Sequence, residues 1–432
     1  MRIRRLAGAM ALATLTASVT LLASPSPAKA ADSIVLPVTS HWQTLADSHH
    51  VYVSSPGDNA VVATDHNGQV IKVVEGLDGA RGMSLTADES TLYVALPETD
   101  AIAEIDTNTL TEVRRIPTGT DTEPENVALA GGRLYFSYQA TVFDAGIGSI
   151  SLAEPTPTVS LDDNPVWFGK PRLASSPAAP DLLVAADSEG PGMRVYDVGS
   201  GTADEIAYTE GVATIEDLAI TPDGQSVITA FGSTYYHQQW RLSDLAEEAQ
   251  YNTGAYPNAV AIAPNGTVAA GVAASGEWDI FVYRRGETTP YRTIDLSYSG
   301  LELLRRGVAW APDASKLFAT RFPGGGEVIL DIITDVNKAN SNITLTAPAT
   351  QPLGETVTVH GTLTSLVPFP TTKVVTVTRN NEQIATAKVK ANGTLTFTDR
   401  PALAGWQFYT VTYAGDANHA SGTGNVQVEI TE

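Results

Sequence analysis

The sequence predicts an all-β protein, a seven-bladed β-propeller followed by a smaller β-sandwich. Seven times along the chain, an apolar residue followed by a small residue leads into a polar turn and a second apolar run. The seven starts are Leu45-Ala46, Met83-Ser84, Val127-Ala128, Leu173-Ala174, Leu218-Ala219, Val260-Ala261 and Val308-Ala309. They lie 38, 44, 46, 45, 42 and 48 residues apart. A period of about 40–45 residues built from short strands is typical of propeller blades.

The turns after several of these starts are nearly interchangeable, which supports a true repeat. They read Thr-Ala-Asp-Glu-Ser at 86–90, Thr-Pro-Asp-Gly-Gln at 221–225, Ala-Pro-Asn-Gly-Thr at 263–267 and Ala-Pro-Asp-Ala-Ser at 311–315. Because one blade cannot bury both of its faces, we expect the repeats to pack around a common axis.

The last repeat lacks a fourth strand, and a spare strand stands before the first repeat. No fourth β-rich run follows Glu327–Ile333, whereas Ile34–Val38 precedes the first repeat. We predict that Ile34–Val38 pairs as the outer strand of blade seven and closes the ring. Pro37 lacks a backbone donor, which suits an outermost strand. The propeller is therefore expected over residues 31–337.

The first thirty residues resemble a targeting segment. Three arginines precede an apolar run from Leu6 to Ala23, and Ala28-Lys29-Ala30 forms an A-x-A cleavage site. We therefore predict a signal peptide over 1–30 and a secreted, extracellular protein, either free or associated with the cell envelope. The chain has no cysteine, which excludes disulfides and thiolate metal sites.

The formal charge of the chain is −22, and removing the four basic residues of the signal peptide makes it −26. Such an acidic body repels nucleic acid and anionic membrane surfaces. We therefore expect no nucleic-acid partner and no membrane insertion, and we expect a monomer. The charge is compatible with basic partners, cations or neutral glycans, although solubility alone also explains it.

From Ile343 the pattern changes to Thr, Val and Gly alternating with a period of two, which suits a β-sandwich. The end of the chain contains Tyr409-Thr-Val-Thr-Tyr413-Ala-Gly-Asp416-Ala-Asn-His419-Ala-Ser421. This run resembles the closing motif of bacterial immunoglobulin-like repeats of secreted and surface proteins. The resemblance implies an immunoglobulin-like β-sandwich, which with its linker covers residues 338–432.

The propeller repeats carry a resemblance of their own. Pro257-Asn-Ala-Val-Ala-Ile-Ala-Pro-Asn-Gly266 and Leu92-Tyr-Val-Ala95 are similar to the repeats of bacterial YVTN-type propellers. The match is to a repeat pattern and not to a catalytic signature. The resemblance therefore implies a fold and names no ligand.

A candidate site follows from the repeat itself. The residue two positions before each repeated pair should fall on a ring around the channel mouth, and most of these residues or their neighbours are charged or amidic. The candidates for ligand binding are Arg81, Glu125, Arg172, Glu216, Asn258 and Arg306. The competing interpretation is that these groups satisfy one another as Arg–Glu pairs in a wet channel mouth.

Three loops on the same face hold aromatic residues beside polar ones. They are Phe143-Asp144, Tyr235-Tyr236-His237 and Glu277-Trp278-Asp279. Exposed aromatic faces beside carboxylates suit sugar rings, so Tyr235, Tyr236 and Trp278 join the candidate ligand site. Packing of these rings between blades is the alternative.

Catalytic motifs are scarce: no G-x-S-x-G, H-E-x-x-H, EF-hand, Walker A or helix-opening G-x-G-x-x-G occurs. We therefore assign no catalytic residue, no metal and no cofactor. The favoured hypothesis is a secreted recognition protein that binds a glycan or protein ligand at the channel mouth, with the second domain as spacer or adhesive unit. Alternatives are a metal-dependent lactonase-like or lyase-like enzyme, with oxygen ligands from Glu125, Asn126, Glu216, Asp217 and Asn258, or an envelope-associated scaffold.

Overall fold

The chain folds into two compact units, and the boundary between them in the sequence lies between Ala339 and Asn340. The computed structural model describes residues 32–141, 144–152, 157–231, 235–274, 278–296, 302–322, 326–369 and 371–432. The signal peptide predicted over 1–30 lies outside these residues. In the described ranges, no helix combines the length and the apolar character that a bilayer crossing requires.

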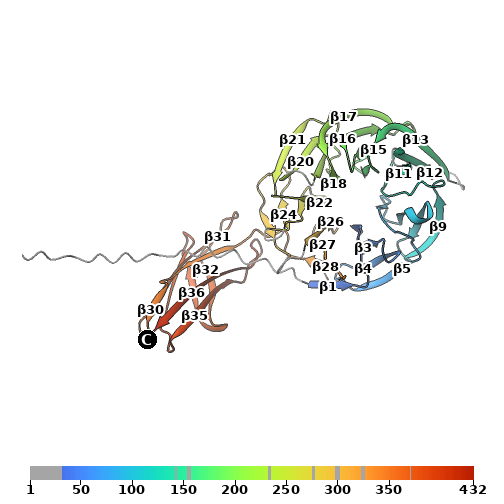
Figure 1. Cartoon of the computed structure of the whole chain (residues 1–432). Coiled ribbons are helices and arrows are strands. Elements are labelled where there is room, and N and C mark those ends of the chain that lie inside the picture. Colours follow the sequence, from blue (N-terminus) through green and yellow to red (C-terminus); the bar gives the residue numbers. More distant parts are fainter. Residues whose placement is uncertain are drawn as a thin grey trace, which may run out of the picture. The chain divides into compact units, whose positions relative to one another are not determined.

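The described part of the first unit holds seven four-stranded antiparallel sheets, six of them built from strands that follow one another in the chain (Figure 1). The first three sheets are β2–β5 (Gln43–Ala46, His50–Ser55, Ala60–Asp65, Val70–Glu75), β6–β9 (Met83–Leu85, Thr91–Leu96, Ala101–Asp106, Thr111–Pro117) and β10–β13 (Val127–Ala130, Arg133–Thr141, Asp144–Ser151, Thr158–Trp167). The next three are β14–β17 (Arg172–Ser176, Ala179–Ala186, Pro191–Asp197, Asp204–Ala213), β18–β21 (Ile215–Ile220, Ser226–Phe231, Tyr236–Arg241, Glu247–Asn252) and β22–β25 (Pro257–Ile262, Val268–Val272, Ile280–Tyr283, Arg292–Ile294). The seventh sheet joins β26–β28 (Glu302–Trp310, Leu317–Phe322, Val328–Ile333) to β1 (Asp32–Leu36). A short 3₁₀ turn, η1 (Pro97–Thr99), links β7 to β8.

Each repeated apolar–small pair lies in the first strand of its sheet, and these first strands surround the centre of the ring in Figure 1. The buried core of this unit divides into seven clusters, each shared by two neighbouring sheets. Since no cluster serves one sheet alone, every blade depends on both neighbours for its burial. The predicted β-propeller is therefore confirmed.

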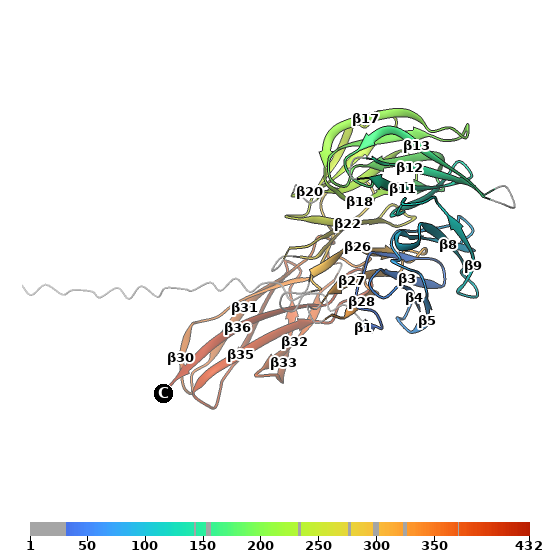
Figure 2. The same cartoon turned by 45° about the vertical axis from the view of Figure 1, so that its right-hand side comes forward.

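The N-terminal strand completes the last sheet. β1 pairs antiparallel with β28, with Asp32 opposite Ile332 and Leu36 opposite Val328, and Figures 1 and 2 both show the two strands side by side. The hydroxyl of Ser33 also donates to the buried carboxylate of Asp331. The strand ends at Leu36, because Pro37 has no N–H to continue the ladder.

The second unit consists of two sheets around one core. One sheet has the order β29–β31–β34 (Asn342–Thr346, Val357–Thr364, Thr394–Asp399). The other has the order β30–β36–β35–β32–β33 (Thr350–Pro352, Gly422–Thr431, Gly405–Tyr413, Lys373–Arg379, Glu382–Val389). Buried residues of both sheets, among them Val359 and Val411, form a single cluster. The period-two pattern seen from Ile343 onward thus places alternate residues in a shared interior.

The closing motif of the second unit converges on one carboxylate. Asp416 accepts hydrogen bonds from the Tyr413 hydroxyl at 2.8 Å, from Lys373 Nζ at 2.7 Å and from His419 Nδ1 at 2.7 Å. Burial raises the pKa of Asp416, but these donors outweigh it and hold that pKa far below its ordinary value. The buried ring of His419 stacks on Phe369 at 4.1 Å between centroids. The motif therefore attaches the connection between β35 and β36 to β32, which carries Lys373.

Candidate functional site

The candidate residues gather on the face of the ring where the chain enters the first strand of each sheet, here called the funnel face. On this face, Glu125 is the shared partner of two arginines. Its carboxylate pairs with Arg81 and, at 3.3 Å, with Nη1 of Arg172, so three consecutive sheets share one acid. Both guanidinium groups also lie over the ring of Trp42, at 4.7 and 5.4 Å from its centroid. This arrangement joins blades one to four through cation–π and ion-pair contacts.

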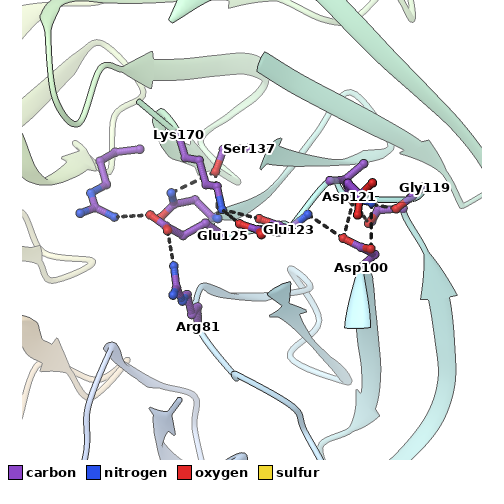
Figure 3. Close-up of polar contacts among 12 residues, drawn as sticks. Arg81, Asp100, Gly119, Asp121, Glu123, Glu125, Ser137 and Lys170 are labelled. Atoms are coloured by element: carbon purple, nitrogen blue, oxygen red, sulfur yellow. Dashed lines mark hydrogen bonds and ion pairs between the residues drawn. The ribbon is translucent and has the colours of Figure 1, made fainter. Parts of the chain in front are cut away.

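Hydrogen bonds from neighbouring residues hold the loop before β10 in place, as Figure 3 shows. The carboxylate of Asp100 accepts hydrogen bonds from the backbone N–H groups of Asp121 at 2.9 Å and Glu123 at 2.8 Å. Lys170 then donates both to the backbone carbonyl of Glu123, at 2.9 Å, and to its side chain, at 3.1 Å. Asp121 and Glu123 both have positive φ, 58° and 43°, so this loop is strained and depends on these contacts.

A second group of charges lies at blades five to seven. Nη1 of Arg306 donates to Asn126 Oδ1 at 2.8 Å, across the channel mouth, and Nε lies 3.7 Å from Asp217 Oδ1. Burial raises the pKa of Asp217 to about 6, although Arg306 opposes that shift. Burial also lowers the pKa of Arg306 to about 10, which still leaves it charged at neutral pH. Next to this pair, Arg305 binds Glu216.

An interruption in β26 presents Arg305 and Arg306 to the mouth. The pairing of β26 with β27 shifts between Leu303 and Val308, and Arg306 has a φ of 54°. The next residue must be glycine, because a Cβ on Gly307 would lie 2.6 Å from the Leu304 carbonyl oxygen. The bulge therefore places two adjacent arginines in the funnel, one buried and one with an exposed side chain.

The funnel face contains a pocket of about 610 Å³, here called the funnel pocket. Its lining residues are Glu216, Tyr256, Pro257, Asn258, Ala273, Glu302, Leu303, Leu304, Arg305 and Phe322. Tyr256 is 60% exposed and has a φ of 60°, an unusual backbone conformation for a bulky residue. Burial raises the pKa of Glu216, while Arg305 and Arg172 oppose the shift. The exposed ring of Tyr256 thus lines the same pocket as the Arg305–Glu216 ion pair.

The predicted ring residues therefore form two groups. Arg81, Glu125 and Arg172 lie together in the rim between blades two and four, while Arg306 bridges to this rim through Asn126. Glu216 and Asn258 line the funnel pocket instead. The side chain of Asn258 donates to the Leu303 carbonyl at 2.8 Å. The acids at these positions are all paired with arginines, which is the arrangement that the competing interpretation describes.

The predicted aromatic residues differ from one another. Tyr235 is 67% exposed, and its carbonyl accepts a hydrogen bond from Gly254, close to Tyr256 in the chain. Tyr236 is half-buried and packs edge-on against Phe231. Trp278 is also half-buried and is not among the residues of the funnel pocket. Phe143 and Glu277, named with these loops, lie outside the described residues.

The oxygen ligands considered for a metal enzyme do not gather into a metal-binding cluster. Within the described ranges, no three or more His, Asp and Glu side chains are placed to hold one ion. Glu125, Glu216 and Asp217 each face an arginine. The positive charge of these arginines disfavours a metal cation at the same carboxylates.

Two residues that shape the site were not selected from the repeat pattern. Trp42 directly precedes the ring position Gln43, and Tyr256 directly precedes Pro257. The only sequence signal is their place next to the ring positions, Trp42 one residue before Gln43 and Tyr256 two residues before Asn258. Their importance depends on backbone geometry and on cross-blade packing, which the repeat spacing does not encode.

The structure resembles solved propellers at low sequence identity. It matches the β-propeller domain of Cps50 (Swd1) from Myceliophteria thermophila with a TM-score of 0.54 and 14% identity, covering 69% of this chain and 99% of that one. Hydrazine synthase from Kuenenia stuttgartiensis matches with a TM-score of 0.53 and 15% identity, covering 70% and 98%. The shared property is the β-propeller fold. At these identities, the likeness carries no activity or ligand from those proteins to this chain.

A sequence profile described as strictosidine synthase-like, N-terminal, matches residues 107–140. This match covers a small part of the chain, from the end of β8 to β11. No curated protein sequence matches the chain. The fold is thus assigned, and the function has to be argued from the site.

Proposed function

We propose that this chain is a secreted recognition protein whose funnel pocket binds a glycan. The observation that carries the proposal is Tyr256, an exposed aromatic ring in a strained backbone conformation at a pocket of about 610 Å³. Strained residues persist where the surrounding structure enforces them, and they concentrate at ligand sites. A pocket of this size lies within the range of small-molecule sites.

The chemistry of the pocket suits a sugar more than an apolar ligand. A pyranose ring can stack its C–H face on Tyr256, and the half-buried Phe322 supplies further apolar surface. Around these rings, Arg305 offers donors and Glu216 offers acceptors, and their ion pair fixes both groups before the ligand arrives. Because only 13% of the Glu216 side chain is exposed while 56% of Arg305 is, Arg305 is the more accessible partner for hydroxyl groups.

We further propose that the propeller belongs to the YVTN-type group and that the second unit is immunoglobulin-like, serving as a spacer or adhesive module. The closing motif that converges on Asp416 supports the second assignment. Export through the predicted signal peptide would place the protein outside the cell, where a monomer could meet cell-wall or environmental glycans.

Replacement of Tyr256 tests the proposed function. We expect Tyr256→Ala to weaken glycan binding at least tenfold, because a stacked aromatic contact contributes about 1.4 kcal/mol or more once its buried area is included. Tyr256→Phe should keep most of the affinity, since the ring remains. The measurement is isothermal titration with glycans that bind the full mature chain on an array.

Tyr208 provides the matched control. It is an exposed tyrosine, 42% accessible, on β17 and away from the funnel pocket, so Tyr208→Ala should leave binding unchanged. Absence of binding to every glycan of the panel would contradict the proposal. So would binding that Tyr256→Ala and Tyr208→Ala affect equally.

A further inference from the structure

The first strands of the seven sheets enclose a second cavity, of about 630 Å³, here called the channel cavity. Its walls include the half-buried side chains of Leu45, Leu85, Leu129 and Ile262. At one end its lining contains turn residues that follow the first strands, such as Pro264 and Pro312. These turns lie on the face opposite the funnel, because each first strand is entered at one end of the ring and left at the other.

The end of the channel cavity nearest the funnel face, here called its floor, is polar. It is lined by residues that also take part in the contacts at the channel mouth. Gln43, Asp217 and Arg306 line the cavity at this end. Only 8% of Gln43 and 9% of Arg306 are exposed. A path of six residues separates Arg306 from Pro312, which corresponds to roughly 20 Å of extended strand. The cavity is therefore long, with apolar side chains among its wall residues and the Arg306–Asp217 pair at one end.

Two donors at this floor have no acceptor in the described part of the chain. Gln43 uses Oε1 to accept the backbone N–H of Met83 at 2.7 Å, which orients its amide nitrogen away from that contact. Arg306 uses Nη1 for Asn126 and Nε for Asp217. No described residue accepts a hydrogen bond from Nε2 of Gln43 or from Nη2 of Arg306. Two largely buried side chains that line the cavity thus each have an N–H group without an acceptor among the described residues.

The charges around the floor leave a positive excess. Among the described mouth residues, Arg81, Lys170, Arg172, Arg305 and Arg306 carry five positive charges, and Glu123, Glu125, Glu216 and Asp217 carry four negative charges. Asp217 is already engaged, since its oxygens accept the N–H groups of Leu218 at 3.0 Å and Val260 at 2.9 Å.

His41, which also lies near Arg306, adds no charge. Burial, together with Arg306, lowers the pKa of His41 to about 3, so its ring is neutral at pH 7. These mouth residues therefore carry one more positive than negative charge, in a chain whose overall formal charge is −22, and Arg306 is the arginine among them that lines the cavity. An anion bound at Arg306 would balance this excess.

We propose that the channel cavity is a second binding site, for a carboxylate that carries an aliphatic chain. The carboxylate accepts from Arg306 Nη2 and Gln43 Nε2 at the floor, and the chain lies along the leucine and isoleucine walls toward the face opposite the funnel. Charge complementarity selects the anionic head, and the apolar walls select the tail. This site is separate from the funnel pocket and does not depend on the glycan proposal.

The test uses octanoate as the probe on the full mature chain. Octanoate should bind, seen by titration calorimetry and by a change in tryptophan fluorescence, because Trp310 lines the cavity. Octanol, which lacks the charge, and acetate, which lacks the chain, should each bind at least tenfold more weakly. If octanoate does not bind, or if octanol binds as tightly, the proposal is overturned.

A matched pair of variants locates the site. Gln43→Glu keeps the acceptor for Met83 but replaces the free donor with a negative charge, so octanoate affinity should fall at least tenfold. Tyr256→Ala in the funnel pocket should leave octanoate affinity unchanged. The reverse result would overturn the proposal by placing octanoate in the funnel pocket. The comparison of the three probes on the unmodified chain decides the matter if Gln43→Glu fails to fold.

Discussion

Deletion of residues 31–40 should lower the melting temperature of the propeller by about 10–20 °C. The deletion removes the strand that pairs with β28, the Ser33–Asp331 hydrogen bond and the buried side chains of Leu36 and Val38. Burial of two such side chains and a short ladder together contribute several kcal/mol. Several kcal/mol correspond to a shift of this size in a unit of about 300 residues. Differential scanning calorimetry measures the shift.

Point substitutions in β1 distinguish the loss of buried contacts in the ring closure from the effect of shortening the chain. Leu36 is 2% exposed and packs in the core between blades seven and one, whereas Val35 is 54% exposed. Leu36→Ser should therefore reproduce a large part of the loss, and Val35→Ser should have little effect. An unchanged melt after the deletion would show that the last blade does not need β1.

The second large effect is expected at Glu125. Removing this carboxylate by Glu125→Ala leaves Arg81 and Arg172 without their shared partner in a buried site. Breaking a buried ion pair from one side typically costs about 3–5 kcal/mol, because the remaining charge stays desolvated. The free energy of unfolding of the propeller should fall by this amount, as measured by hydrogen exchange of its slowest peptides in increasing urea.

Glu123 offers a control two residues away. Its side chain is 62% exposed, and its partner Lys170 is also held by the Glu123 backbone carbonyl (Figure 3). Glu123→Ala should therefore cost less than about 1 kcal/mol. Equal losses in the free energy of unfolding of the two variants would mean that the pairing of Glu125 with Arg81 and Arg172 does not stabilise the propeller as expected.

Much of the propeller could be predicted because its repeat has a local signature. Each blade needs an apolar–small pair in its first strand and a tight polar turn after it, so the spacing alone locates Leu45, Val127 or Val308 in equivalent strands. The pairing of β1 with β28 follows from counting strands, since a ring with an incomplete last sheet would expose an edge.

The candidate site could be predicted only in part. The ring positions gave Arg81, Glu125 and Arg306, but not which acid each arginine would meet, because those contacts cross between blades. The pocket beside Tyr256 arises from a left-handed residue and a bulge in β26, and neither changes the spacing of the repeat. Tyr236 and Trp278 were chosen by residue type, and both turned out to be half-buried.

Hydrogen-exchange footprinting with a bound glycan is the most direct test of the funnel pocket as the ligand site. On saturation with the glycan, protection should appear in peptides covering Glu216, 254–258 and 302–305, which line the pocket from three neighbouring blades. Peptides of the second unit and of blades two to four should exchange as in the free protein. Protection confined to those other regions, with none around Tyr256, would contradict a glycan site in the funnel.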